Sequence, residues 1–127
     1  MFRPTAIINL NHLQNNVRYI KSTLNKKTDI IPVIKANAYG HGLLPVAKIL
    51  KNEGIEYVSV ATIEKVEEVL KLDLDFKILH LGKCSKKHVN IYSNKNVIGT
   101  INTMNDIDFL TKQKNKNFNV HIKVNTG

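Results

Sequence analysis

The chain has 127 residues, a hydrophobic fraction of 43% and a formal net charge of +9 at pH 7. This length suits one ordinary domain, and the hydrophobic fraction favours a packed core over a disordered chain. The single cysteine, Cys84, excludes an intramolecular disulfide and a cysteine metal cluster. The histidines share no metal-ligand spacing either, so we expect no metal site.

The positive charge comes from lysines spread along the chain, with Arg3 and Arg18 as the two arginines. Proteins that read nucleic acids usually show arginine clusters or interleaved aromatic residues. Neither pattern occurs here, so we expect no nucleic-acid partner. No apolar stretch is long enough to cross a bilayer, and the N-terminus does not read as a signal peptide. We therefore expect a cytoplasmic protein with no membrane partner.

Strand-like and helix-like segments alternate along the chain, a pattern that predicts parallel βα units. We expect strands over residues 5–9, 29–34, 57–61, 76–81, 96–101 and 118–124. We expect helices over residues 11–24, 43–53, 62–70, 85–92 and 103–114. Thr62 and Ser85 are plausible N-caps, and Met104 should face the core of the last helix.

Five of these strands, from Asp29 onward, can belong to one sheet. A doubly wound sheet can close with five strands, whereas an eight-stranded βα barrel takes about 250 residues. The pattern of elements alone leaves both architectures open.

The run from Val33 to Gly42 reads Val-Ile-Lys-Ala-Asn-Ala-Tyr-Gly-His-Gly and places Lys35 at the end of an apolar strand. The carboxyl ends of parallel strands open onto the ligand crevice of α/β proteins. A lysine in an apolar setting loses its proton more readily, and the neutral amine attacks an aldehyde to form a Schiff base. The aldehyde most often found in this role is pyridoxal phosphate, PLP. The ordinary alternative is a solvated lysine after a buried strand.

This run resembles the cofactor-attachment motif of the alanine racemases, a strand rich in valine or isoleucine followed by Lys-Ala-Asp/Asn-Ala-Tyr-Gly-His-Gly. Residues 9–13, 78–82 and 121–127 also resemble segments of that family, with Asn9 and Asn125 at positions where it usually has aspartate. The resemblance implies an α/β fold of parallel βα units that form the first part of a PLP-binding TIM-type (β/α)8 barrel. Residues 1–127 would be the N-terminal portion of that domain, ending after about five barrel strands, before a separate β domain.

The resemblance also implies roles for individual residues. Lys35 would hold PLP covalently and then act as one of two proton-transfer bases. Tyr39 would donate a hydrogen bond to the cofactor phosphate, although a tyrosine packed in the loop is the ordinary alternative. Lys123 matches a lysine that carbon dioxide carbamylates in several members, and an ordinary lysine is the alternative there. The second base would be a tyrosine of the β domain, donated across a homodimer interface.

The implied activity is PLP-dependent racemisation of L-alanine to D-alanine for cell-wall precursors, and we expect the 127 residues alone to be a poor catalyst. A racemase of broader amino-acid specificity shares the motif. A PLP-barrel decarboxylase is a further alternative, although its motif lacks the Tyr-Gly-His-Gly tail. Two non-enzymatic alternatives are a PLP-binding carrier and a basic interaction module without a cofactor.

Overall fold

The structure is a computed structural model that describes residues 3–127. Met1 and Phe2, which begin the stretch considered for a signal peptide, lie outside this range. The helices are α1 (Leu10–Thr23), α2 (Lys35–Tyr39), α3 (Leu43–Asn52), α4 (Ile63–Leu70), α5 (Val89–Tyr92) and α6 (Met104–Thr111). A 3-10 turn, η1 (Lys86–His88), leads into α5, and the strands are β1 (Tyr57–Val60), β2 (Lys77–Lys83), β3 (Val97–Ile101) and β4 (Asn119–Ile122).

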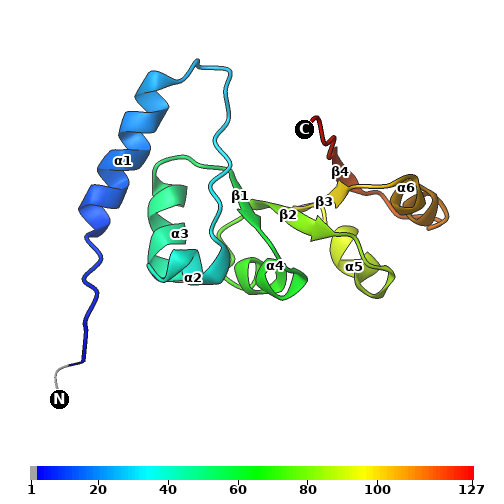
Figure 1. Cartoon of the computed structure of the whole chain (residues 1–127), viewed down its shortest axis with the longest axis horizontal. Coiled ribbons are helices and arrows are strands. Elements are labelled where there is room, and N and C mark those ends of the chain that lie inside the picture. The colour runs from blue at the N-terminus through cyan, green and yellow to red at the C-terminus, as the bar shows by residue number, and fades with distance from the viewer. Residues whose placement is uncertain (1–2) are drawn as a thin grey trace.

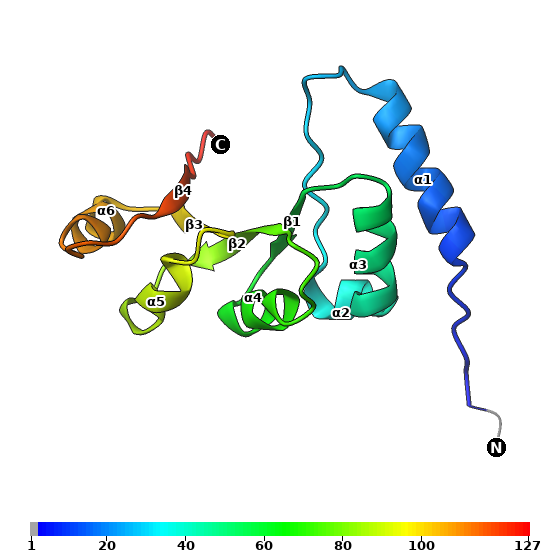
Figure 2. The same cartoon turned by 180° about the vertical axis from the view of Figure 1, so that it is seen from behind.

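The four strands form one sheet in the order β1-β2-β3-β4, and every neighbouring pair is parallel. Figures 1 and 2 show α3, α4, α5 and α6 following one face of this sheet, with α1 outside α3. No helix of the described residues lies across the opposite face. The expected class, α/β with parallel βα units, is therefore confirmed.

The apolar side chains of α3 and α4 form the helix side of the core. In α4, Ile63, Val66 and Val69 recur every third position and are all buried, whereas Glu64 and Glu67 are exposed. In α3, the buried residues are Leu43, Val46, Ala47 and Leu50. Because successive strand residues alternate between the two faces, Val58, Val60 and Ile78 meet these helices from the sheet. This layer is the core of the molecule.

The first two predicted strands are wrong as ladder strands. Residues 5–9 pair with no strand of the described chain, and Asn9 instead caps α1 by accepting hydrogen bonds from the Asn11 and His12 N–H groups. Residues 29–34 touch the sheet only through one bridge, Val33 to Ser59. Proline has no N–H, so Pro32 cannot donate to a ladder and the pairing stays short.

One further expectation on the last elements is wrong. Met104, predicted to face the core, is 70% exposed at the first turn of α6. All four residues of β4 are exposed, because β4 has β3 on one side and little cover from the helices of the described residues. The helices begin close to the predicted residues. Thr103 and Asp106 form a capping box at the N-terminus of α6.

No helix among residues 3–127 is both long and apolar enough to cross a membrane. The same part of the chain holds no group of three or more His, Cys, Asp or Glu side chains arranged for a metal ion.

Candidate active site

The register of the sheet defines which side chains share its helix-free face. Val33, Ser59, Leu79, Ile98 and Asn119 form one row across the five neighbouring segments. The adjacent positions face the helices. His80 belongs to that second set, since its Nδ1 lies 3.1 Å from the Tyr92 hydroxyl of α5. The row from Val33 to Asn119 therefore points away from the helices.

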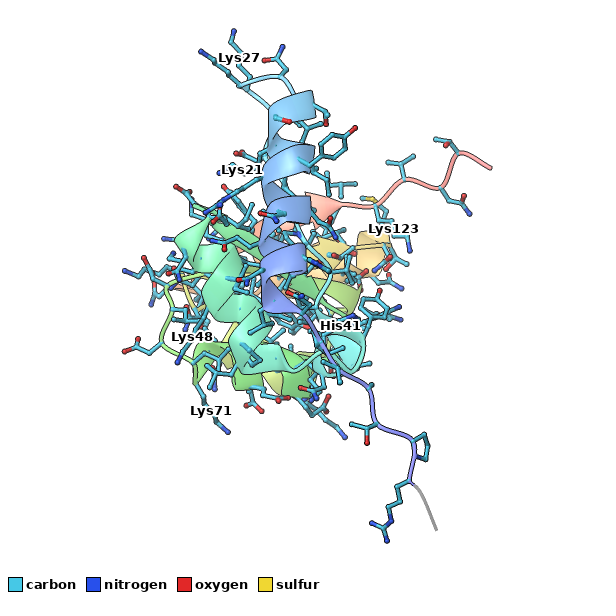
Figure 3. The ribbon with its side chains drawn as sticks, turned by 90° about the vertical axis from the view of Figure 1, so that its left-hand side faces the viewer. Lys21, Lys27, His41, Lys48, Lys71 and Lys123 are labelled. Carbon is cyan, nitrogen blue, oxygen red and sulfur yellow. The ribbon has the colours of Figure 1, made fainter. Side chains whose placement is uncertain are left out.

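Lys35 and Lys123 lie at the carboxyl ends of parallel segments, which open at the same edge of the sheet. Lys35 is the first residue of α2, two positions after the bridge of Val33 with Ser59. Lys123 keeps the parity of Asn119, and its N–H donates to the Ile101 carbonyl at 2.9 Å, which prolongs the pairing beyond β4. In Figure 3, Lys123 and His41 lie on the same side of the molecule, opposite Lys48 and Lys71.

Immediately after Lys35 the backbone turns with left-handed geometry. The φ/ψ values are 50°/53° for Ala36, 54°/46° for Asn37 and 52°/49° for Ala38, and φ is 55° for Tyr39. α2 is therefore one turn of left-handed helix. For L-residues this conformation costs roughly 1–2 kcal/mol per residue, and asparagine tolerates it best after glycine. Strain of this kind is concentrated at functional sites in folded proteins.

Two glycines follow this turn. Gly40 has φ of 82° and Gly42 has φ of 95°, values that residues with a side chain rarely adopt. At Gly42 a β carbon would also lie 3.0 Å from Cγ of Pro45 in the first turn of α3. The two glycines of the motif therefore serve the backbone path from the turn into α3.

The turn brings Lys35 and Tyr39 together. The Lys35 Nζ lies 5.8 Å from the centroid of the Tyr39 ring, and Tyr39 is 57% exposed. No carboxylate of the described residues pairs with Lys35. Lys35 itself is exposed, whereas the sequence predicts an apolar setting. The physical reason is that Lys35 begins the turn beyond the paired part of its segment, whereas Ser59 and Leu79, inside the sheet, are buried.

An apolar cavity of about 330 Å³ lies beside the turn, between α1, residues 30–34 and α3. Tyr39 and His41 line it together with aliphatic side chains of those elements. The Nδ1 of His41 lies 2.9 Å from the Ala38 carbonyl, so this histidine ties the turn to the loop that follows.

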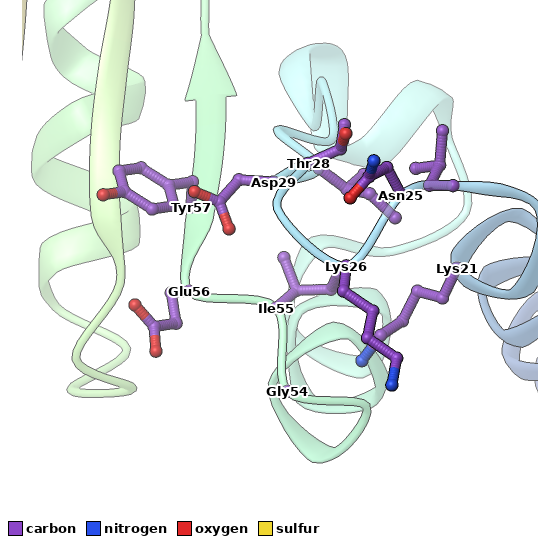
Figure 4. A pocket seen from close by; sticks show the side chains of 11 residues that line it. Lys21, Asn25, Lys26, Thr28, Asp29, Gly54, Ile55, Glu56 and Tyr57 are labelled. Carbon is purple, nitrogen blue, oxygen red and sulfur yellow. The ribbon is translucent and has the colours of Figure 1, made fainter.

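A second pocket, shown in Figure 4, lies away from these residues. Lys21, Asn25, Asp29, Gly54 and Tyr57 contribute to its lining, at the end of α1 and before β1. It therefore faces the amino ends of the strands. Lys35 and Lys123 lie at the carboxyl ends, so this pocket is separate from the candidate site.

The remaining histidines and the cysteine lie outside the site. His80 is buried, and desolvation lowers its pKa. Burial also raises the pKa of the Cys84 thiol and raises the pKa of Tyr92 to about 12. His121 is exposed on β4, which has β3 on one side and little cover from the helices of the described residues.

Sequence reasoning missed Asn37 as a site residue. Its carboxamide oxygen accepts a hydrogen bond from the Leu43 N–H at 2.8 Å, across six positions of sequence. A weak signal was available, because asparagine is enriched several-fold among the non-glycine residues that adopt left-handed backbone.

The chain matches known proteins along almost its whole length. The profile of the family described as "Alanine racemase, N-terminal domain" covers residues 8–127. The alanine racemase of Borreliella burgdorferi is 34% identical over 127 residues, which cover 97% of this chain. The chain belongs to the alanine racemase family.

Other members of the alanine racemase family give the same picture. Alanine racemase 2 of Caldanaerobacter subterraneus is 32% identical over 129 residues, covering 98% of this chain. The chain spans about a third of the length of these relatives, 34% of the first and 33% of the second.

Solved alanine racemases share the fold. The enzyme from E. faecalis superimposes with a TM-score of 0.87 at 27% identity, over 94% of this chain and 33% of that structure. Alanine racemase of Clostridium difficile 630, solved in complex with cycloserine, gives 0.81 at 31% identity, over 92% and 32%. A histidine racemase from Leuconostoc mesenteroides matches at 22% identity with a TM-score of 0.78, which shows likeness of fold alone. The two alanine racemase structures show that the sheet and helices of this chain have the fold of the alanine racemase barrel.

Proposed function

We propose that this chain carries the PLP-attachment site of an alanine racemase, an isomerase that interconverts L- and D-alanine. The observation that carries the proposal is the placement of Lys35 and Tyr39 at the two ends of one turn in a chain of this family. The Lys35 Nζ lies 5.8 Å from the centroid of the Tyr39 ring. We take residues 1–127 as the N-terminal portion of the PLP-binding barrel domain.

The residues present fit PLP, which offers an aldehyde and a phosphate to a protein. Lys35 is exposed and forms no ion pair within residues 3–127, so its amine is accessible to an aldehyde. Tyr39 exposes a phenol, which can donate a hydrogen bond to a phosphate oxygen without adding charge. Bound PLP supplies an electron sink that delocalises the negative charge left at the substrate Cα.

Lys35 would move the Cα proton on one face of the substrate. Racemisation removes that proton from one face and returns it on the other, so a second base must stand opposite Lys35. By the family resemblance that base is a tyrosine outside this chain, reached across a homodimer interface. The isolated 127 residues should therefore turn over poorly.

Lys123 enters the proposal as a candidate for carbamylation. Its amine would attack carbon dioxide and lose a proton, giving a carbamate with one negative charge in place of the ammonium. Its exposed position at the carboxyl edge, where Lys35 also lies, is compatible with such a group. An anion there would orient a cationic partner near the cofactor.

Alanine is the proposed substrate because the relatives of about a third identity are named alanine racemases. The broader-specificity racemase shares the motif, and no contact of the described residues separates the two. D-alanine made in the cytoplasm would supply cell-wall precursors.

The test is covalent capture of PLP on this chain. Purified protein is mixed with PLP, its absorbance recorded, then reduced with borohydride and digested for peptide mapping. We expect the adduct on Lys35, lost in Lys35→Arg and kept in the control Lys48→Arg, which changes an exposed lysine of α3. An adduct spread evenly over surface lysines, unchanged in Lys35→Arg, would contradict the proposal.

The activity is tested by exchange of the alanine Cα hydrogen for deuterium in heavy water, followed by NMR. We expect exchange that depends on Lys35 and on PLP, with little net racemisation by the 127 residues. Racemisation by this chain at the rate of a full-length family member would contradict the assignment of the second base to a region outside it.

A further inference from the structure

Asn37 stands between the two proposed cofactor residues and accepts hydrogen bonds from three N–H groups that follow the turn. Its backbone carbonyl accepts the N–H of Gly40 at 3.2 Å and of Gly42 at 3.0 Å. Its side-chain oxygen accepts the N–H of Leu43 at 2.8 Å. One residue therefore binds the exit of the turn and the start of the next helix.

We infer that Asn37 is a positioning residue, which holds Lys35 and Tyr39 in the arrangement that PLP requires. The inference rests on the proposed function, because it assigns Asn37 a role relative to those two residues. It adds to that function a contact that holds the turn in place.

The carboxamide of Asn37 acts as an N-terminal cap of α3, although Asn37 lies six residues before Leu43. Gly42, at the N-cap position of α3, has no side chain to accept a hydrogen bond from the first turn. The Asn37 oxygen supplies that acceptor at Leu43. Because Leu43, Val46, Ala47 and Leu50 are buried, α3 is anchored in the core, and the bond from Asn37 transmits this anchoring to the turn.

The turn needs such an anchor, since its other residues disfavour the conformation. Ala36, Ala38 and Tyr39 carry a β carbon and gain no local hydrogen bond from their side chains in the left-handed region. Without the bond to Leu43, rotation of these residues toward right-handed or extended backbone would carry Tyr39 away from Lys35. His41 supports the same geometry through its contact with the Ala38 carbonyl, 2.9 Å from Nδ1.

The choice of asparagine satisfies both requirements at once. Asparagine adopts left-handed backbone more readily than other residues with a β carbon, and its amide oxygen is a good acceptor. Aspartate shares both properties. Glycine accepts the backbone but has no side-chain acceptor, and alanine offers neither. Comparing these four residue types at position 37 therefore distinguishes the effect of left-handed backbone from the effect of the side-chain acceptor.

The experiment compares Asn37→Asp, Asn37→Gly and Asn37→Ala with the unchanged chain, using Asn15→Ala in α1 as a matched control. Three quantities are measured: exchange of the Leu43 amide hydrogen, the ring-current shift of the Lys35 ε protons next to Tyr39, and the yield of the borohydride-reduced PLP adduct on Lys35. Tyr39→Leu sets the ring-current baseline. Protection of the β1, β2 and β3 amides checks that each variant is folded.

In Asn37→Gly we expect Leu43 to exchange about tenfold faster, as for loss of one hydrogen bond. The Lys35 shift should fall to the Tyr39→Leu baseline, and the adduct yield at limiting PLP should fall about tenfold. Asn37→Asp should retain all three properties, and Asn37→Ala should lose them at least as far as Asn37→Gly. A purely structural cap would lose Leu43 protection in Asn37→Gly but keep the Lys35 shift and the adduct, and that result overturns the inference.

The two proposals fail separately. If the unchanged chain forms no adduct on Lys35, the proposed function is contradicted for these 127 residues. The Lys35 shift and the Leu43 exchange still decide whether Asn37 holds the two side chains together, since neither measurement needs PLP.

Discussion

Two polar regions of this chain, one between β2 and α5 and the other at the turn after residues 29–34, differ in their exposure to solvent. His80 and Tyr92 are packed between β2 and α5, 3% and 2% exposed, with their polar atoms joined. Lys35 and Tyr39 stand exposed on a turn whose backbone is left-handed. The polar groups of the first region contact each other inside the protein, whereas those of the second region are accessible to a ligand.

The difference follows from what covers each face of the sheet. The helix-facing side is sealed, so a buried polar group there needs a partner from the protein itself. The helix-free side has no such cover among the described residues, and the turn after Lys35 is held by hydrogen bonds of its own backbone and of Asn37. Substitutions should therefore affect stability in the first region and ligand capture in the second.

The largest effect should come from a cavity in the sealed layer. Ile78 is 1% exposed on β2, so Ile78→Ala should lower the free energy of unfolding by about 3 kcal/mol. Urea denaturation measures it. Tyr39→Leu, on the exposed turn, should change the same quantity by less than about 0.5 kcal/mol. Equal losses at the two positions would remove the distinction between the regions.

Gly82 sharpens the comparison at the edge of the sealed layer. β2 and β3 shift register between Leu79 and Lys83, and the Thr100 hydroxyl donates to the His80 carbonyl at 2.6 Å. A β carbon on Gly82 would lie 2.7 Å from the Ala61 carbonyl oxygen, which backbone holds in place. Gly82→Ala should therefore cost about 2 kcal/mol of unfolding free energy, measured by thermal or urea denaturation. An unchanged stability would mean that the irregular pairing adjusts freely.

The pH dependence of stability tests the sealed layer in another way. Desolvation lowers the pKa of His80 below its ordinary value of 6.5, so the unfolded chain binds a proton more readily than the folded one. Stability from this residue should be complete above about pH 6.5 and should decrease as pH falls toward the lowered pKa. Glu64 and His88 also act on His80, in opposite directions.

Urea denaturation at a series of pH values, compared between the unchanged chain and His80→Gln, measures this contribution. The slope between neutral and mildly acidic pH should be shallower in His80→Gln. Identical slopes would show that His80 gains protons as easily in the folded as in the unfolded chain.

The smallest expected change in stability concerns the exposed turn. Here the direction of the change is more informative than its size. In an ordinary helix, glycine in place of alanine lowers stability by about 1 kcal/mol. Ala36 is exposed with φ of 50°, so Ala36→Gly should leave stability unchanged or raise it by up to about 1 kcal/mol. Lys48→Gly compared with Lys48→Ala, at an exposed position of α3, provides the ordinary right-handed reference. A loss of similar size at both positions would contradict the left-handed turn.

Much of the fold could be predicted from the sequence, because burial along a single element leaves a periodic trace. The spacing of Ile63, Val66 and Leu70 predicted α4, and the helix predicted over residues 43–53 is observed over Leu43–Asn52. The alternation of strand-like and helix-like segments also predicted that Lys35 and Lys123 follow parallel segments at their carboxyl ends. The functional roles of Lys35, Tyr39 and Lys123 stay predictions.

Tertiary structure decided what depends on distant partners. The pattern of residues 29–34 matched a strand, but pairing requires an N–H at each donor position, and Pro32 has none. The exposure of His121 was set by the place of β4, which has β3 on one side and little cover from the helices of the described residues. The left-handed turn needed the acceptor of Asn37 to meet the Leu43 N–H of a helix already anchored in the core. Periodicity records which face of an element is buried, whereas edge position and backbone handedness depend on hydrogen bonds that only the folded chain brings together.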